Sequence, residues 1–192
     1  MKRKVYYYDD LIKIRDMEPS DAEIITNEEI AQGWDQMIDK YHRRLRDQEA
    51  GVAVSLVAEY KGSVAGYINV YPDSKWGAFA NRGLPEIIDI GVLEKYRHLG
   101  IGNKLMDAAE MIAAQFSHTV YLGVGLHHGY GSAQRMYVKR GYIPDGSGVW
   151  YRNSICPPYS DCNNDDDLVL YLSKELTDTF SVLVQEPIVS LE

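Results

Sequence analysis

The hydrophobic pattern along the chain predicts short strands separated by amphipathic helices. Apolar and basic residues alternate over residues 11–15, which is typical of a strand. Pro19 then opens a helical stretch that continues, with a break near Gly33, to about residue 47. Two apolar, β-branched runs flank Lys61-Gly62, an arrangement that predicts a hairpin. In order, the predicted strands are residues 11–15, 51–60, 63–71, 86–93, 120–126, those around 149–151, and 168–172.

Two helices in the second half of the chain have clear boundaries. The first follows a turn at residues 94–100, and its apolar residues recur with the spacing of one helix face. The second covers residues 132–140 and stops at Gly141, a residue type that favours the position after a helix. The order of strands and helices predicts an α/β domain, with a mixed sheet and helices on its faces. The apolar face of the first helix comprises Leu105, Met106, Ala109, Ile112, Ala113 and Phe116.

Composition narrows the class of protein. With 192 residues, 45% of them apolar and 25% charged, the chain fits a single domain over residues 1–192 with its core in about 11–175. No apolar run approaches the ~18 residues of a membrane span, so we expect no membrane partner. The N-terminus lacks the apolar stretch of a secretory signal, which predicts a cytoplasmic protein. The segment 177–192 is apolar in patches and is expected to pack on the core or on a second subunit of a homodimer.

Charge and cysteine content bear on two further classes of function. The net charge of −8 argues against nucleic acid as a partner, because nucleic-acid-binding domains normally carry a basic face. Cys156 and Cys162 have no histidines near them in the sequence, so their spacing does not predict a zinc site. We therefore expect two free thiols and no metal ion.

One turn carries the pattern of an anion site. The segment Arg97-x-x-Gly100-x-Gly102 lies between a strong predicted strand and a strong predicted helix. The first turn of a helix has unpaired backbone N–H groups and partial positive charge, and glycines let a phosphate approach the backbone closely. A plain tight turn would need the glycines, but neither the arginine nor the amphipathic helix that follows. The pattern therefore favours phosphate binding.

Two segments resemble the motifs of a known family. The segment IIDIGVLEKYRHLGIGNKLMDAAE is similar to the cofactor motif of the GNAT superfamily of N-acetyltransferases, R/Q-x-x-G-x-G/A. The segment AQRMYVKRGY resembles the second motif, A-x-x-x-Y-x-x-x-G-F/Y, with Ala133, Tyr137, Gly141 and Tyr142 at the motif positions. The resemblance, to an uncharacterised bacterial-type branch, implies the GNAT fold, with a mixed central sheet of six to seven strands and four flanking helices. It also implies acetyl-CoA as the co-substrate.

The same resemblance implies which residues hold acetyl-CoA. The end of the strand before the turn pairs with the pantetheine amides as an added strand would, and backbone N–H groups of the turn hold the pyrophosphate. The family often has Asn three residues before the alanine of its second motif, where this chain has Tyr130, and the stretch between Val124 and Ala133 is longer than usual. The expected cofactor-binding residues are Ile90, Gly91, Val92, Arg97, His98, Leu99, Gly100, Ile101, Gly102 and Asn103.

Two residues are candidates for the chemistry, which needs a base for the amine and assistance to the departing thiolate. Tyr137 matches the family's phenol near the sulfur of CoA. Glu86 lies eleven residues before Arg97, the offset of the base in the histone acetyltransferase branch. Regular alternation would place Glu86 on the strand face of Ile88, Ile90 and Val92. The alternatives are a core aromatic for Tyr137 and a solvated strand-end carboxylate for Glu86.

Other polar residues are further candidates. Asp89 is expected on the strand face opposite to Glu86, where a buried carboxylate needs a partner. His127 and His128 follow a strand at the edge where α/β ligand sites open, and imidazole titrates near neutral pH. The aspartate run 165–167 could attract a cationic amine, but a solvated run at a strand edge is the preferred interpretation.

The function predicted from the sequence is transfer of an acetyl group from acetyl-CoA to a primary amine of a small molecule. Acetylation of a peptide or protein amine is the alternative within the same fold, and a non-catalytic acyl-CoA-binding module is the alternative without chemistry. Tyr137 and Glu86 together favour an enzyme. A nucleotide site is disfavoured, because the turn lacks the Lys-Ser/Thr of a P-loop and the third glycine of a dinucleotide motif.

Overall fold

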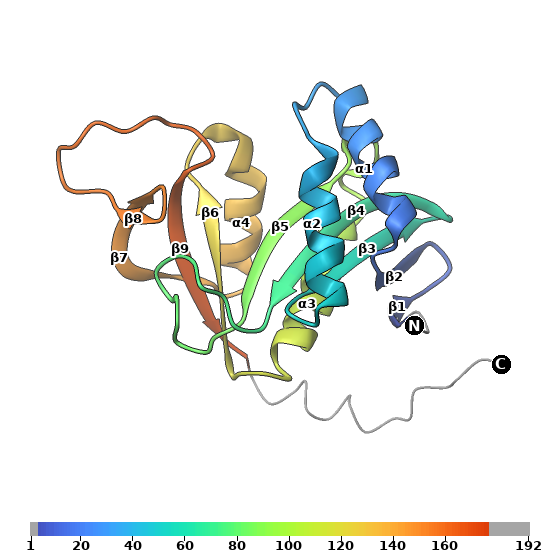
Figure 1. Cartoon of the computed structure of the whole chain (residues 1–192), viewed down its shortest axis with the longest axis horizontal. Coiled ribbons are helices and arrows are strands. Elements are labelled where there is room, and N and C mark those ends of the chain that lie inside the picture. The colour runs from blue at the N-terminus through green and yellow to red at the C-terminus, as the bar shows by residue number, and fades with distance from the viewer. Residues whose placement is uncertain (1–3, 177–192) are drawn as a thin grey trace.

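The computed structural model describes residues 4–176, in which one nine-stranded sheet lies between two layers of helices (Figure 1). The four α-helices are α1 (Pro19–Ala31), α2 (Ile38–Glu49), α3 (Ile101–Ala113) and α4 (Gly131–Lys139), and the short 3-10 helices are η1 (Glu94–Tyr96) and η2 (His128–Tyr130). The strands are β1 (Val5–Tyr8), β2 (Ile12–Asp16), β3 (Val54–Tyr60), β4 (Ser63–Tyr71), β5 (Glu86–Val92), β6 (Thr119–Gly125), β7 (Ile143–Tyr151), β8 (Ser154–Ile155) and β9 (Leu168–Glu175).

The sheet is mixed, as the sequence predicts. The strand order is β1-β2-β3-β4-β5-β6-β9-β7-β8, and every neighbouring pair is antiparallel except β5 and β6, which are parallel. The sheet has two strands more than the upper expectation of seven. These are β1, a four-residue strand that follows the basic start of the chain and pairs with β2, and the two-residue β8, which is too short to leave a pattern.

The β3–β4 hairpin forms where the sequence predicts it. Lys61 and Gly62 both have positive φ angles, 50° and 82°, which a two-residue turn between twisted strands requires. The predicted break in the first helical stretch is also confirmed, because α1 ends at Ala31 and α2 begins at Ile38.

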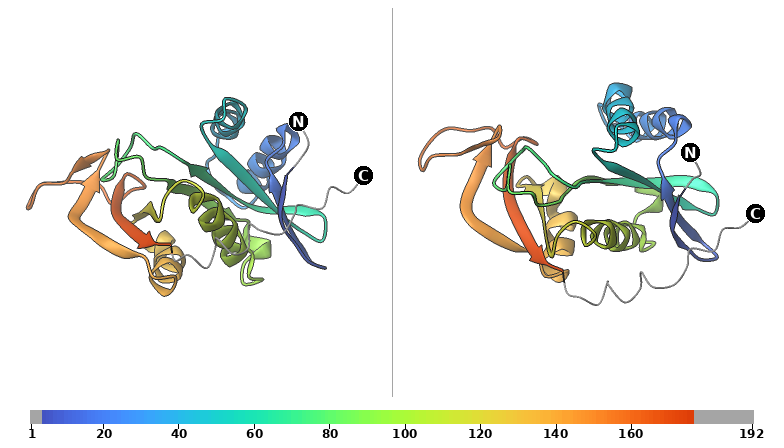
Figure 2. Two further views of the ribbon diagram at one scale, coloured as in Figure 1. Left: turned by 90° about the horizontal axis from the view of Figure 1, so that it is seen from below. Right: turned by 60° about the horizontal axis from the view of Figure 1, so that its bottom comes forward.

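The two layers of helices differ in what they cover. Helices α1 and α2 lie on one face of the sheet and α3 lies on the other, as Figure 2 shows in its right-hand view. The apolar face of α3 enters the main core as expected, with Leu105, Met106 and Ala109 fully buried. Phe116 was wrongly placed on that face, since α3 ends at Ala113 and the Phe116 side chain is 52% exposed.

The remaining expectations concern the C-terminal segment, membrane-spanning helices and the cysteines. The segment 177–192 lies outside the described residues, so its packing and a homodimer stay predictions. No helix within residues 4–176 is long and apolar enough to cross a membrane. Cys156 and Cys162 are free thiols, as predicted.

Candidate functional site

The site begins where β5 and β6 separate. These parallel strands pair at one position only, between Glu86 at the start of β5 and Tyr121 of β6. Beyond that pair the strands diverge, as can be followed in Figure 1, and no strand among residues 4–176 pairs with the edge of β5 that faces β6. An unpaired strand edge offers backbone N–H and C=O groups to an extended ligand. The wedge between β5 and β6 therefore suits a chain that carries amide groups.

A β-bulge in β5 accompanies the separation. On β4, Tyr67 and Asn69 pair with Gly91 and Ile88 of β5, so one β4 residue lies opposite two residues of β5. Asp89, one of the two, has a φ angle of 58°, in the left-handed region that few residues other than glycine adopt. The bulge changes which residues of β5 share a face.

The bulge overturns the expected alternation. Ile90 packs against the cluster under α3, as does Val92, whereas Gly91 lies against the ring of Tyr67 on the α2 face. Glu86 is opposite Tyr71 on that same α2 face, so it is not on the face of Ile90. Asp89 was expected to face away from Glu86, and it too points to α2, because the bulge shifts the alternation by one residue.

The turn after β5 is a row of free backbone donors. Within residues 4–176, no hydrogen bond uses the N–H groups of residues 98–103, and the first such bond in the helix runs from the Lys104 N–H to the Gly100 carbonyl at 3.2 Å. The expected residues His98, Leu99, Gly100, Ile101, Gly102 and Asn103 supply these six donors. Free N–H groups at a helix N-terminus favour a bound anion.

The shape of the turn is consistent with approach by a phosphate group. Gly100 caps α3 with a φ of 83°, and a Cβ atom added there would meet no protein atom within 4 Å. Arg97 lies beside the turn, 3.2 Å from a Glu94 carboxylate oxygen and stacked 5.7 Å from the ring of Trp34. Its guanidinium is half-exposed, so it remains accessible to an anion.

Glu86 lies at the closed end of the wedge and is almost completely buried. Its side chain is 6% exposed, and the hydroxyl of Tyr121 donates to its Oε2 atom at 3.4 Å. Burial raises the pKa of Glu86 to about 7, although Ser74, Tyr121 and the charge of Arg44 act in the opposite direction. A carboxyl group with this pKa can take up and release a proton near neutral pH.

Tyr137 enters from the opposite side of the sheet. It lies on α4 in the core formed with α3, and its ring is 5.9 Å from that of Tyr142. Within the described part of the chain its hydroxyl makes no hydrogen bond, and burial raises its pKa above the ordinary value. The phenol is therefore protonated at neutral pH and free to donate to a ligand.

The histidine candidates lie at the open end of the wedge. His127 accepts the Gly129 N–H at Nδ1 (3.1 Å), so its proton is on Nε2, which lies 2.9 Å from Oδ1 of Asp166. Tyr130, which replaces the motif's asparagine, donates to the same oxygen at 2.9 Å, and its ring covers Gly125. His128, His127 and Asp165–Asp166 line a shallow cavity of about 320 Å³. Since both nitrogens of His127 have partners, this imidazole is not poised as a base.

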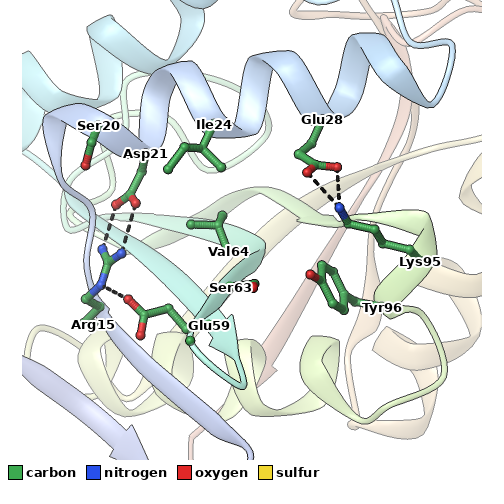
Figure 3. Close-up of a pocket in the computed structure, with 11 residues that line it drawn as sticks. Arg15, Ser20, Asp21, Ile24, Glu28, Glu59, Ser63, Val64, Lys95 and Tyr96 are labelled. Carbon is green, nitrogen blue, oxygen red and sulfur yellow. Dashed lines mark hydrogen bonds and ion pairs between the residues drawn. The ribbon is translucent and has the colours of Figure 1, made fainter.

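A separate cavity of about 370 Å³ lies between α1 and the β3–β4 hairpin (Figure 3). Its charged side chains pair with one another: Arg15 binds Asp21 at 2.6 Å and Glu59 at 2.6 Å, and Lys95 binds Glu28 at 2.6 Å. Each of these charged side chains thus has a partner of opposite charge, and the cavity contributes no group to the wedge.

The sequence missed three features of the site. Arg44 and Lys40 of α2 hold Asp89, and Tyr121 holds Glu86. The sequence signal for the contacts of Asp89 was its position in the middle of an apolar strand, because a buried aspartate needs a partner. Nothing local identified α2 as the source of that partner. No group of three His, Cys, Asp or Glu side chains within residues 4–176 is arranged to hold a metal ion.

Comparisons with known proteins agree with this geometry. The profile described as the Acetyltransferase (GNAT) family matches residues 13–142. An N-alpha-acetyltransferase of Sulfurisphaera tokodaii is 36% identical over 98 residues, which are 47% of this chain and 56% of that protein. The matched region therefore spans little more than half of that relative.

Solved structures share the fold at low sequence identity. The ribosomal L7/L12 alpha-N-protein acetyltransferase RimL superimposes with a TM-score of 0.68 at 9% identity, covering 91% of this chain and 95% of RimL. The acetyltransferase yncA of Salmonella typhimurium, solved with acetyl-CoA, has a TM-score of 0.63 at 16% identity, covering 94% and 99%. At these identities the likeness concerns the fold.

Proposed function

Because this chain belongs to the GNAT family of acetyltransferases, we propose that it transfers the acetyl group of acetyl-CoA to the α-amine of a polypeptide. The observation that carries the cofactor assignment is the continuity of two features. The free edge of β5 is followed, after the short 3-10 helix η1, by the row of free N–H groups at residues 98–103. Pantetheine amides fit the first feature and a pyrophosphate fits the second.

We assign the base and the hydrogen-bond donor to the leaving group to residues on opposite faces of the sheet. Glu86 takes the proton of the incoming amine, directly or through one water, as its nitrogen attacks the thioester carbonyl carbon. The new C–N bond forms and the C–S bond breaks. Tyr137 donates a hydrogen bond to the departing sulfur, which leaves as the thiolate and takes up, through solvent, the proton that Glu86 has accepted from the amine. The Glu86 pKa of about 7 suits a base at neutral pH.

The choice of a polypeptide acceptor is supported by the relatives. The Sulfurisphaera tokodaii protein is described as an N-alpha-acetyltransferase, and RimL is described as an alpha-N-protein acetyltransferase. The small-molecule acceptor expected from the sequence remains a prediction, and the acceptor panel described next tests it. Cytoplasmic location likewise remains a prediction.

An acceptor panel tests the proposal. The full-length chain is incubated with acetyl-CoA and with peptides that have a free N-terminus, the same peptides blocked at the N-terminus but containing lysine, or small amines. We expect CoA release with the unblocked peptides, and mass spectrometry should place one acetyl group on the terminal nitrogen. Release with small amines alone would establish the small-molecule acceptor. Release with blocked peptides alone would indicate a lysine acceptor.

A further inference from the structure

The bulge in β5 is tied to α2 by a charged side chain. Asp89 receives two hydrogen bonds from Arg44 on its Oδ2 atom, at 2.7 Å from Nη2 and 3.1 Å from Nε. The ammonium group of Lys40 lies 3.2 Å from the other oxygen, Oδ1. Both cations come from α2, and together they hold the pKa of Asp89 below its usual value despite its burial. The carboxylate is thus ionised and held at both oxygens.

Arg44 is itself fixed, so it is a rigid anchor. Its Nη1 atom lies 2.6 Å from the hydroxyl of Tyr71, which also hydrogen bonds to Asp47 of α2. Tyr71 stands on β4 directly opposite Glu86. A guanidinium that binds one carboxylate oxygen through two nitrogens and a phenol through the third has little freedom to move.

Beyond the bulge, a second contact holds β5 in the same position. The ring of Tyr67 lies so close to Gly91 that an added Cβ atom would be 2.5 Å from its Cζ atom. The Tyr67 hydroxyl donates to Glu29 at 2.6 Å and lies 3.5 Å from Lys40. The strand is therefore held from the side of α1 and α2 at Asp89 and at Gly91, both beyond the point where it leaves β6.

We propose that Asp89 is a positioning residue for acetyl-CoA: its ion pairs with Arg44 and Lys40 hold the β5 bulge, which presents the free strand edge to pantetheine. The inference rests on the proposed function. A non-glycine residue at positive φ persists only where its surroundings enforce that conformation, and here the enforcing groups are the two cations. Loss of the pair would let β5 relax toward regular geometry and disturb the edge without touching the pyrophosphate turn.

Two ligands separate these effects. In the proposed binding mode CoA contacts both the strand edge and the turn, whereas 3′-phospho-ADP, the half of CoA without pantetheine, contacts the turn alone. Calorimetry on the full chain should show that Asp89→Asn, which tolerates positive φ but lacks the charge, weakens CoA binding about tenfold, the scale of a lost charge-assisted hydrogen bond. Its Kd for 3′-phospho-ADP should be unchanged. The KM for acetyl-CoA should rise while kcat at saturation is retained.

Matched variants keep the test decisive. Asp89→Gly adopts the bulge conformation most easily, so a defect equal to that of Asp89→Asn assigns the effect to the ion pair and not to the backbone. Asp107→Asn removes an exposed carboxylate that binds Arg140 at 2.7 Å, and it should bind CoA as wild type does.

The contrary outcomes are distinct. Normal CoA affinity in both Asp89 variants, or equal weakening of both ligands, would overturn the positioning role. Failure of the wild-type chain to bind either ligand would overturn the proposed function, and this inference with it.

Discussion

The hydroxyl of Tyr121 lies 3.4 Å from Oε2 of Glu86, at the single residue pair that joins β5 to β6. The same hydroxyl lies 3.1 Å from the Trp76 carbonyl oxygen, and Ser74 of the same loop hydrogen bonds to Glu86, so the loop after β4 contributes to the burial of the carboxylate. Glu86 is thereby removed from water while it keeps hydrogen-bonding partners. This burial places its pKa near 7 and underlies the first two predictions.

The first prediction concerns the pH dependence of the rate. A base is active when it is deprotonated, so kcat/KM of the wild type should rise through about pH 7. Glu86→Gln should lose this rise in kcat/KM around pH 7, and its kcat/KM at pH 7 should be roughly 10² to 10³-fold below that of the wild type. At high pH, where the free amine is abundant, kcat/KM of the variant should partly recover. Initial rates from pH 5.5 to 9.5 measure it. His127→Ala should keep the rise in kcat/KM around pH 7, because both ring nitrogens of His127 already have hydrogen-bond partners. If His127→Ala lost the rise in kcat/KM around pH 7 and Glu86→Gln kept it, His127 and not Glu86 would be the base.

The second prediction concerns stability. The pKa of Glu86 rises from 4.5 to about 7 on folding. Between these values the unfolded chain gives up a proton that the folded chain retains, so the free energy of unfolding falls as pH rises through this range. The loss should total about 3 kcal/mol above pH 7. Urea unfolding of Glu86→Gln, which cannot ionise there, should lack this loss. Parallel pH profiles for the two proteins would show that Glu86 is not buried as described.

The third prediction concerns Tyr137. Tyr137→Phe keeps the packing of the ring against α3 and removes only the hydroxyl. Folding and the Kd for acetyl-CoA should be retained, while kcat should drop by roughly one to three decades. Steady-state kinetics and calorimetry measure the two effects separately. Wild-type turnover would mean that Tyr137 is a core aromatic only.

The fourth prediction concerns the pyrophosphate turn. A leucine at Gly100 would block the approach of phosphate to the free N–H groups, so acetyl-CoA should no longer raise the melting temperature. The wild type should gain ~2.7 kcal/mol at a hundredfold excess over Kd. Gly51→Leu is the matched control, because Gly51 also has a positive φ (71°) and no atom within 4 Å of an added Cβ. A full shift in Gly100→Leu would exclude the turn as the phosphate site.

The features predictable from the sequence are the local ones. The arginine, the two glycines and the apolar helix of the turn lie within a few residues of one another, so their pattern alone indicates an anion site. The hairpin at Lys61-Gly62 was predictable for the same reason.

The features that sequence reasoning missed depend on distant partners. Arg44 and Asp89 are 45 residues apart, and only the packing of α2 on β5 brings them together. Regular alternation therefore failed at Asp89, and with it the predicted face of Glu86. The burial of Glu86 likewise depends on a loop and on Tyr121, 35 residues away, and no local pattern contains either.

In the proposed reaction this chain moves an acetyl group to an amine with Glu86 as the base. The most direct measurement quantifies CoA and N-acetylated product together, by mass spectrometry, for wild type and Glu86→Gln with acetyl-CoA and the best acceptor. The wild type should form both in equal amounts and only when the acceptor is present. Glu86→Gln should bind acetyl-CoA equally well and form both about 100-fold more slowly at pH 7. CoA release without acetylated product, or an unchanged rate in Glu86→Gln, would contradict the account.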